Sequence, residues 1–398
     1  MKDIYHLMLR KAAHFQTHHA LFTILLLISL GIVAYGYSTK VETVASLENM
    51  MPSHVEEIKA FNVLRDNAMG QDMIGIVAEI DRDTVLDKPI ADIRDYEVMR
   101  YIDSISDIIR QETDIISVYS ASDILRHANS GKFPDKEAYD GLIKDKRIAE
   151  QLSNFINSDF TNTIIIASTD TSANDYRMSS LTNSIKDTLD QYGHPPGIDI
   201  KLTGTPVIQL ELAKLIGHDR KNTQWISTLL VFIITAILFG TLTSALVPII
   251  VVTISVTFLY GTMGYFGLPI STLAGGVAAM VIGIGIDYAI HLMNRFRFER
   301  RKGNSIKESI EMAVVETGTA LTATSLTTMA AFLAFLIGSM PEMGRFGILM
   351  AIGVTYSLFF SIFGLPALLV AEEWAIYHIK KKLKFGVEGE FRLEDRKC

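Results

Sequence analysis

The arrangement of apolar and polar positions divides the chain into several long apolar stretches and one long, more polar stretch. The apolar stretches lie at about residues 20–34, 224–243, 245–266, 270–294, 313–338 and 345–371. A helix of about 20 apolar residues crosses the roughly 30 Å hydrocarbon core of a bilayer, and the last five stretches reach that length. The pattern therefore predicts a mostly α-helical membrane protein whose first two spans are separated by the polar stretch.

The first apolar stretch is shorter and allows two interpretations. Lys2, Arg10 and Lys11 precede it, as basic residues precede the apolar part of a signal peptide. A small-residue cleavage site is not evident, however, and Tyr35 and Tyr37 follow the stretch as an aromatic belt would. We interpret it as an uncleaved first span, which gives six transmembrane helices in a one-plus-five arrangement.

Basic residues predict the orientation, because the cytoplasmic ends of spans carry an excess of Lys and Arg. Six spans place both termini on one side, together with the loop between the fourth and fifth spans. On this side lie Lys2, Arg10, Lys11, Arg295, Arg297, Arg300, Arg301, Lys302, Lys380, Lys381, Lys382 and Lys384. We therefore expect a multi-pass protein of the cytoplasmic membrane, with both termini in the cytoplasm and residues 40–222 outside it.

Residues 40–222 have the pattern of a folded α/β or α+β domain. Runs rich in β-branched residues predict strands at 73–80, 115–119, 163–168 and 198–202. Helical periodicity predicts helices at about 93–110, 136–157, 173–192 and 206–218. Strands that alternate with helices favour helices packed on a sheet. The predicted organisation is a first segment at 1–39, this domain at 40–222, five spans at 223–375 and a basic tail at 376–398.

The composition agrees with a membrane protein that carries a sizeable polar domain. Of the 398 residues, 49% are hydrophobic and 20% are charged, and the mean hydropathy is +0.27. The formal net charge of −7 gives no reason to expect nucleic-acid binding. The single cysteine, Cys398, permits neither an intrachain disulfide nor a cysteine metal site. His14, His18 and His19 lack an acid or cysteine to complete a metal site, so we interpret them as interfacial anchors.

One carboxylate, Asp287, interrupts an otherwise uncharged stretch of spanning length. At about 1.5 Å per residue it lies on the order of 12 Å inside the basic end of the predicted span. An acid at that depth costs roughly 2.5–3.5 kcal/mol, so such residues often mark proton or ion pathways. Tyr288 is adjacent, and Gly283 and His291 lie one turn before and one turn after Asp287. This spacing is compatible with a proton relay, and also with a structural acid hydrogen-bonded between helices.

Four motifs occur in a fixed order along the chain. They are LENMMPSHVEEIKAF (47–61), LTGTPVIQLEL (202–212), GIGIDYAIHL (283–292) followed by RFRFER, and TGTALTATSLTTMAAFLAFLIGSMPEMGRFG (317–347). In this order and topology they resemble one half of a resistance–nodulation–division (RND) superfamily transporter, in its mycobacterial-membrane-protein-large (MMPL-like) branch. The resemblance covers nearly the whole chain. It implies a porter-like outer domain built from two βαβ-type subdomains.

Members of that family usually contain two such halves, related by a pseudo-two-fold axis. Because this sequence contains one half, the resemblance implies that a second copy supplies the other, although a different partner chain is also compatible. Proton coupling in the family is assigned to Asp–Tyr pairs on the central helices of the two halves. The matching residues here are Asp287 and Tyr288, which would face each other across the axis. Gly283 and Gly285 would let the two helices approach, or would serve ordinary helix packing.

Three further residues are weaker candidates for the same site. His291 is either a member of the relay or an interfacial histidine. Thr324 and Ser325 lie in the fifth span, where their hydroxyls can hydrogen-bond Asp287, hold water near it, or bond their own backbone carbonyls. Glu316, near the cytoplasmic end of that span, is expected to be solvated or paired with an arginine.

The resemblance implies a transporter driven by the proton-motive force, which exports lipids or other hydrophobic molecules as a dimer of half-size chains. Protons are then the coupling ion, and no cofactor or metal is expected. Two alternatives share parts of this topology: a translocation accessory resembling the SecD/SecF pair, and a lipid-binding module resembling sterol-sensing domains. The sequence contains no nucleotide-binding P-loop and no nucleophile elbow, which argues against an enzyme or an ATP-driven pump.

Overall fold

The computed structural model describes residues 2–43, 72–82, 90–169 and 175–382, with a few positions between 52 and 59. The chain forms two compact units, an outer unit and a bundle unit. The outer unit contains the described residues from 52 to 213, and the bundle unit contains residues 2–43 and 214–382. Most of the motif at 47–61 lies outside the described residues, as do Lys384 and Cys398.

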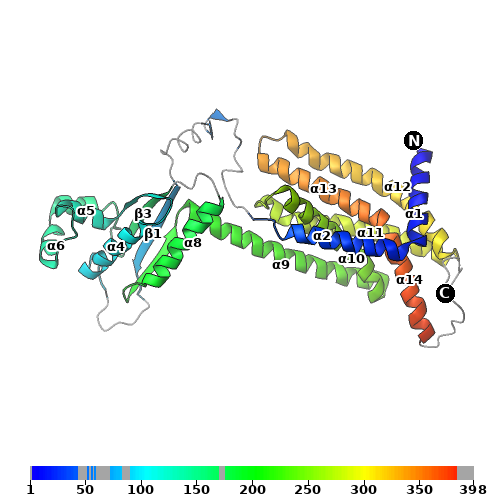
Figure 1. Cartoon of the computed structure of the whole chain (residues 1–398), viewed down its shortest axis with the longest axis horizontal. Coiled ribbons are helices and arrows are strands. Elements are labelled where there is room, and N and C mark those ends of the chain that lie inside the picture. The colour runs from blue at the N-terminus through cyan, green and yellow to red at the C-terminus, as the bar shows by residue number, and fades with distance from the viewer. Residues whose placement is uncertain are drawn as a thin grey trace. The chain divides into compact units, whose positions relative to one another are not determined.

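The outer unit is built on one four-stranded sheet (Figure 1). Its strands are β1 (Asp72–Ile80), β2 (Ile115–Tyr119), β3 (Asn162–Thr169) and β4 (Ile198–Thr203). The strand order is β2-β3-β1-β4, and every neighbouring pair is antiparallel. In the central pair Ile76 lies opposite Ile165, and on its other side Ile76 lies opposite Leu202. The described strands therefore form an α+β domain with one shared sheet.

Helix α4 (Tyr96–Ile109) connects β1 to β2, and helix α8 (Asp175–Tyr192) connects β3 to β4. Each connection is a βαβ unit whose two strands are separated by a strand of the other unit, which is the split βαβ arrangement of ferredoxin-like folds. The expectation of two separate βαβ subdomains was therefore wrong for the described residues. The two units exist, but they interleave in a single sheet because β1 and β3 pair with each other at its centre.

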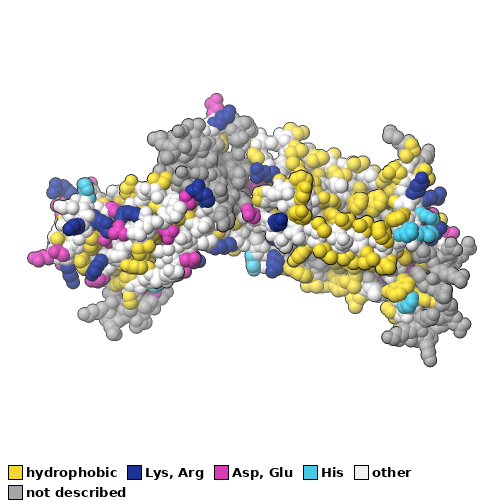
Figure 2. Space-filling model, viewed as in Figure 1, with side chains coloured by type: hydrophobic (Ala, Val, Ile, Leu, Met, Phe, Trp, Pro, Cys, Tyr) yellow, Lys and Arg dark blue, Asp and Glu magenta, His cyan; other side chains and the backbone are white. Residues whose placement is uncertain are grey.

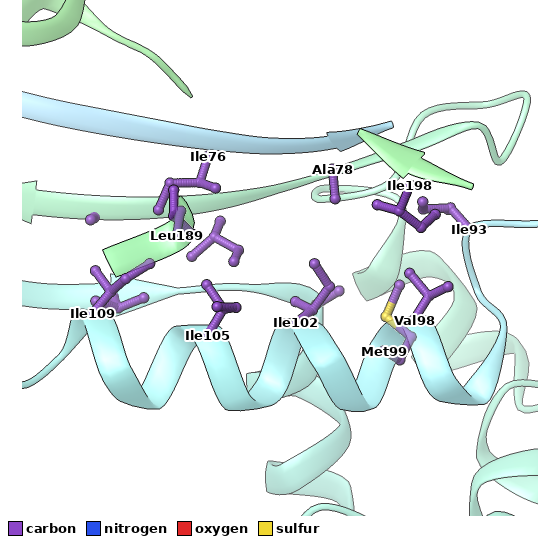
Figure 3. Close-up of a cluster of buried hydrophobic side chains, with 14 of the residues drawn as sticks. Ile76, Ala78, Ile93, Val98, Met99, Ile102, Ile105, Ile109, Leu189 and Ile198 are labelled. Carbon is purple, nitrogen blue, oxygen red and sulfur yellow. The ribbon is translucent and has the colours of Figure 1, made fainter. Parts of the chain in front are cut away.

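The core of the outer unit lies between the sheet and its helices, as Figure 3 shows. Along α4 the apolar side chains recur at helical spacing and point to the sheet, at Val98, Met99, Ile102, Ile105 and Ile109. Alternate residues of β1, at Ile74, Ile76 and Ala78, belong to the same buried cluster. Figure 3 shows Ile76 and Ala78 on the side of the sheet that faces α4. Burial of these side chains is the main favourable term that holds helix and sheet together.

The segment between β2 and β3 departs from the expected pattern. Instead of one helix at 136–157 it contains α6 (Lys136–Leu142) and α7 (Lys146–Leu152), preceded by α5 (Ala121–Ala128). The break has a local cause, because Asp145 caps α7 by accepting a hydrogen bond from the amide of Arg147 at 2.8 Å. An aspartate at that position favours a new helix start over continuation of the preceding helix.

The described residues of the bundle unit are mostly helical. Its helices are α1 (Lys2–His18), α2 (Ala20–Ser38), α9 (Thr205–Phe239, which begins in the outer unit), α10 (Leu242–Phe266), α11 (Val277–Arg301), α12 (Ile306–Leu333), α13 (Pro341–Phe363) and α14 (Leu365–Lys382). Short 3-10 helices precede α11 at Leu273–Gly276 and follow α12 at Ala334–Ile337. Within the described part of the chain, six helices are long and apolar enough to cross a membrane, and they match the six predicted spans. Figure 2 shows hydrophobic side chains over much of the visible surface of this unit.

Two boundaries differ from the expected spans. The helix expected at 206–218 and the second span form the single helix α9, which has 35 residues. The sixth span, expected to continue to 371, ends at Phe363, and a separate helix follows Gly364. Pro366 has no backbone N–H to continue the hydrogen-bond ladder of α13, so a new helix begins there.

Close helix packing in the bundle depends on glycines, and two of them show this most directly. A Cβ on Gly353 of α13 would lie 2.3 Å from Cγ2 of Val281 on α11. A Cβ on Gly264 of α10 would lie 1.9 Å from the backbone oxygen of Tyr37 on α2. Neither position admits a side chain without movement of a helix, so these glycines set the distances between the helices.

Candidate functional site in the fourth span

Asp287 lies at the midpoint of the fourth span, which comprises Leu273–Arg301. At about 1.5 Å per residue, Asp287 lies roughly 21 Å from Leu273 and roughly 12 Å from Arg295, the first residue of the basic end. The side chain is exposed at the surface of the chain, and none of the described residues hydrogen-bonds or ion-pairs with it. A carboxylate at this depth cannot be satisfied by lipid, so its partner is a group outside the described residues or water.

Asp287 belongs to an exposed stripe along α11, which we call the open stripe. Its members are Met280, Gly283, Asp287, His291 and Asn294, spaced three or four residues apart on one helix face. Met280 is 50% exposed, and a Cβ on Gly283 would meet no atom within 4 Å. Gly283, Asp287 and His291 therefore lie together, as the sequence predicted, and another helix can approach them closely.

Tyr288 lies on a different face of α11 from its neighbour Asp287. It is only 6% exposed and packs with Leu321 of α12 and Val354 of α13. The phenol is therefore enclosed in its own chain, and its contact with Asp287 of a second copy stays a prediction. Gly285 also points inward, where its Cβ would lie 2.8 Å from the hydroxyl of Ser357 on α13.

The two hydroxyls of the fifth span have different surroundings. Thr324 is exposed and donates to the backbone oxygen of Leu321 at 3.0 Å, as most membrane threonines do. Ser325 is fully buried, and its hydroxyl lacks a well-formed hydrogen bond among the described residues. It lies close to the phenol of Tyr288, which makes these two hydroxyls neighbours inside the bundle. Thr324 therefore lies at the surface, and Ser325 belongs with Tyr288.

The basic end of α11 is held by a buried ion cluster. Glu299 is 2% exposed and accepts from Lys302 at 3.0 Å and from Asn304 at 2.9 Å. Arg295 lies 2.9 Å from Glu299 and also binds Glu316 of α12. A buried carboxylate requires such partners, and here it has three. Glu316 is paired with an arginine, which was one of the two expected outcomes.

Two further ion pairs join the same end of α11 to α14. Arg297 lies 3.5 Å from Glu372, and Arg300 lies 3.4 Å from Glu373. The hydroxyl of Ser244 on α10 also donates to Glu372. Helix α14 is therefore fixed against α11 and α10 by charge as well as by packing.

The opposite end of the fourth span is held by a different acid. Glu342, in the first turn of α13, is 4% exposed and accepts a hydrogen bond at 3.2 Å from the amide of Leu273. Residues that fix the ends of the span, Glu299, Glu342 and Glu372, were not singled out from the sequence. The available signal was their position beside apolar stretches, where an acid needs a partner.

Both ends of the fourth span are thus fixed by contacts of buried acids with neighbouring residues. The middle of the span is exposed and carries the ionisable carboxylate of Asp287. A carboxylate can bind and release a proton, and a neighbouring imidazole can relay one. Among the described residues, no group of three or more His, Cys, Asp or Glu side chains is placed to hold a metal ion.

Comparison with known proteins shows that the chain is similar in sequence to membrane proteins, some of which are exporters. A family profile described as MMPL family matches residues 56–386. A membrane protein of Methanocaldococcus jannaschii is 32% identical over 381 residues, which are 94% of this chain and 97% of that protein.

Two mycobacterial exporters match shorter parts of the chain. The sulfolipid-1 exporter of Mycobacterium tuberculosis is 25% identical over 173 residues, which are 42% of this chain and 16% of the exporter. The trehalose monomycolate exporter of Mycolicibacterium smegmatis is 29% identical over 131 residues, which are 31% of this chain and 12% of that exporter. The aligned parts thus span less than a fifth of these two exporters, whose names describe transport and no enzymatic reaction.

Proposed function

We propose, because this chain belongs to the MMPL family, that it is a proton-driven secondary transporter that exports lipids or other hydrophobic molecules as a homodimer. The exposed carboxylate at the midpoint of the fourth span carries this proposal. The family match favours it over the SecD/SecF-like and sterol-sensing alternatives, which rest on shared topology alone. The identity of the cargo rests on the names of the two mycobacterial exporters, both of which export lipids.

A second copy is the simplest partner for the open stripe. A two-fold axis beside α11 brings each Asp287 to the opposite α11, and Gly283 lets the two backbones approach. The pairing also removes both carboxylates from lipid, where each is costly. This arrangement would bury the open stripes of both copies.

Proton binding at Asp287 would then bias the dimer between two packings. Two carboxylates near one axis repel each other when ionised, and protonation of one removes that repulsion and creates a hydrogen-bond donor. One elementary charge that moves through 100 mV supplies about 2.3 kcal/mol. That energy shifts a two-state equilibrium by roughly fiftyfold. Because α11 is held at both ends, a change at its middle reaches α12, α13 and α14.

The orientation of the bundle follows from its charges. The end that carries Arg10, Lys11, Arg295, Arg297 and Arg300 would face the cytoplasm by the positive-inside rule. The outer unit would then lie outside the cytoplasm, in the position where cargo leaves the membrane. Protons would enter Asp287 from that side and leave toward His291, which is nearer the basic end.

Reconstitution with a defined probe tests this function. The purified chain is placed in liposomes that contain fluorescent phosphatidylethanolamine, and transfer of this probe to acceptor vesicles is measured with and without a pH gradient. The gradient should accelerate transfer by wild-type protein and should have no effect on Asp287→Asn, which keeps the size of the side chain but cannot ionise. Asp190→Asn, at an exposed acid of the outer unit, is the control and should behave as wild type.

Two results would contradict the proposal. Gradient-driven transfer by Asp287→Asn at the wild-type rate would make Asp287 a structural residue. A wild-type chain that transfers no probe, while a proton-sensitive dye inside the liposomes shows no proton entry either, would argue against a proton-driven transporter as a whole.

A further inference from the structure

Helix α1 contains a second cluster of charged and titratable side chains, remote from Asp287. A pocket of about 460 Å³ lies along this helix and is lined by Leu7, Arg10, Lys11, His14, Phe15, His18, His19 and Glu311. Figure 2 shows the same concentration of cationic and histidine side chains at the end of the bundle unit where α1 lies in Figure 1. The proton pathway described above uses none of these residues.

The position of α1 is that of a helix lying at a membrane surface. It ends at His18, and the chain changes direction at His19 before the first span α2 begins at Ala20, so that α1 points away from the direction of the spans (Figure 1). One face of α1 is buried in the bundle, through Leu9 and Ala13. Other apolar side chains of α1 remain exposed, among them Ile4 at 66% and Met8 at 64%. Exposed apolar and basic side chains together are typical of helices that lie in the interfacial region of a bilayer.

The charges of the pocket are suited to an anion. Arg10 and Lys11 supply two fixed positive charges, and Glu311 of α12 supplies one negative charge. Glu311 is only weakly engaged, at 3.9 Å from Arg10 and 3.5 Å from His14. The imidazoles of His14 and His18 lie beside each other, with ring centroids 4.2 Å apart. Guanidinium, ammonium and imidazole groups are the donors that bind phosphate oxygens.

An apolar path leads from this pocket to the lipid-facing side of the first span. Phe15 lines the pocket, is 50% exposed, and contacts the ring of Phe22 on α2 edge to face at 6.5 Å. Phe22 is 57% exposed and is followed one turn later by Leu25 and Leu26, which are also exposed. A bound molecule with an anionic head in the pocket and acyl chains along α2 would therefore meet matching surfaces over its whole length.

We propose that this pocket is a binding site for the headgroup of one anionic phospholipid, whose acyl chains lie along Phe15, Phe22 and the exposed side of α2. The lipid belongs to the leaflet at the basic end of the bundle. It holds α1 at the membrane surface and lies next to α12, because Arg10 and His14 of the pocket also contact Glu311 of α12. The site is separate from Asp287 and is independent of which molecule the chain transports.

Direct binding measurements test the site on the full-length chain. Wild-type protein in a neutral detergent is titrated with fluorescent phosphatidylglycerol and, in parallel, with fluorescent phosphatidylcholine. We expect saturable binding of phosphatidylglycerol at one site per chain and markedly weaker binding of phosphatidylcholine. In Arg10→Gln/Lys11→Gln, the dissociation constant for phosphatidylglycerol should rise roughly thirtyfold, as expected for two basic residues that contact an anionic headgroup.

A matched control removes the same charge elsewhere at the basic end. Arg301→Gln/Lys307→Gln changes two basic residues outside the pocket and should leave the dissociation constant within about twofold of the wild-type value. Equal losses of affinity in the two double variants would overturn the proposal, because binding would then depend on general surface charge. Equal affinity for phosphatidylglycerol and phosphatidylcholine in the wild type would overturn it as well.

Two further measurements distinguish binding of a lipid from binding of a free anion. Inorganic phosphate and glycerol phosphate should displace the fluorescent lipid only at concentrations far above those of short-chain phosphatidylglycerol. Phe15→Gln should weaken binding of the lipid and leave any binding of glycerol phosphate unchanged. Displacement by inorganic phosphate as effective as displacement by the lipid would mean that the pocket binds phosphate ions alone, against the proposal. These outcomes do not depend on transport, so they can fail while the proposed transporter function stands.

Discussion

Asp287 and Tyr288 are neighbours in the sequence but lie in different environments on α11. Asp287 is exposed on the open stripe, whereas Tyr288 is 6% exposed and packs against α12 and α13. Adjacent residues of a helix are rotated by about 100°, so one can point out of the bundle while the other points into it. The carboxylate is therefore available to a second chain, whereas the phenol is enclosed by its own chain.

The open stripe predicts which positions lie near each other in a dimer. In a Cys398→Ser background, Met280→Cys should form a disulfide-linked dimer on mild oxidation in native membranes, because Met280 lies on the stripe. Trp225→Cys, at a 69% exposed position of α9 away from the stripe, is the matched control and should cross-link poorly. The product is measured on non-reducing gels. Efficient cross-linking at Trp225→Cys alone would place the interface on another face.

The surroundings of Tyr288 predict a milder effect than removal of Asp287. Tyr288→Phe removes one hydroxyl near Ser325 and leaves the titrating carboxylate in place, so gradient-driven transfer of the fluorescent lipid should be reduced but not abolished. Ser325→Ala should have a similar effect if the two hydroxyls act together. Wild-type transfer by both variants would show that the carboxylate acts without the phenol.

Two glycines should respond to the same substitution in different ways. Gly353→Ala places a methyl group 2.3 Å from Val281 and should lower the free energy of unfolding of the bundle by about 1–3 kcal/mol. Gly283→Ala meets no atom of its own chain within 4 Å and should leave the melting temperature of the monomeric chain unchanged. It should instead weaken the dimer, measured by sedimentation in mild detergent. A Gly283→Ala chain with lower monomer stability and unchanged association would contradict the proposed axis.

An ion pair in the outer unit predicts a stability change that depends on pH. Arg126 donates to Asp103 at 2.7 Å and also binds Asp107. Burial raises the pKa of Asp107, but hydrogen bonds from Arg126 and Arg110 outweigh it and leave the pKa below its ordinary value of 3.8. A lowered native pKa contributes stability above pH 3.8 that is lost as pH falls through the native value. Arg126→Met should therefore destabilise α4 most at neutral pH.

The expected loss from Arg126→Met is about 2 kcal/mol at pH 7, the usual contribution of a hydrogen bond to a charged group. Hydrogen exchange of the α4 amides in the full chain measures it, and the difference from wild type should shrink toward pH 3. Arg147→Met is the control. The Arg147 side chain is 88% exposed, and its ion pair with Asp145 is long, at 3.5 Å, so its loss should change stability little. A loss that is the same at pH 7 and pH 3 would show that packing, and not charge, explains the effect.

The sequence by itself determined the elements that depend on composition and periodicity. Apolar stretches of spanning length located the six membrane helices of the described residues, because a single apolar segment satisfies its own backbone hydrogen bonds in lipid only as a helix. The four strands of the outer unit were located for a similar reason, since β-branched runs favour a pleated and half-buried surface. Asp287 was identified because an acid in such a stretch is costly wherever its side chain points.

Only the tertiary structure decided which residues face one another. The interleaving of the two βαβ units depends on which strands pair at the centre of the sheet, and strand pairing is a contact between residues far apart in the chain. The burial of Tyr288, the inward position of Gly285 and the ion pairs of Glu299 and Glu372 depend on where α12, α13 and α14 pack around α11. Local sequence determines whether a segment is stable as a membrane helix. Packing against helices that are distant in the chain determines which face of that helix points into the bundle.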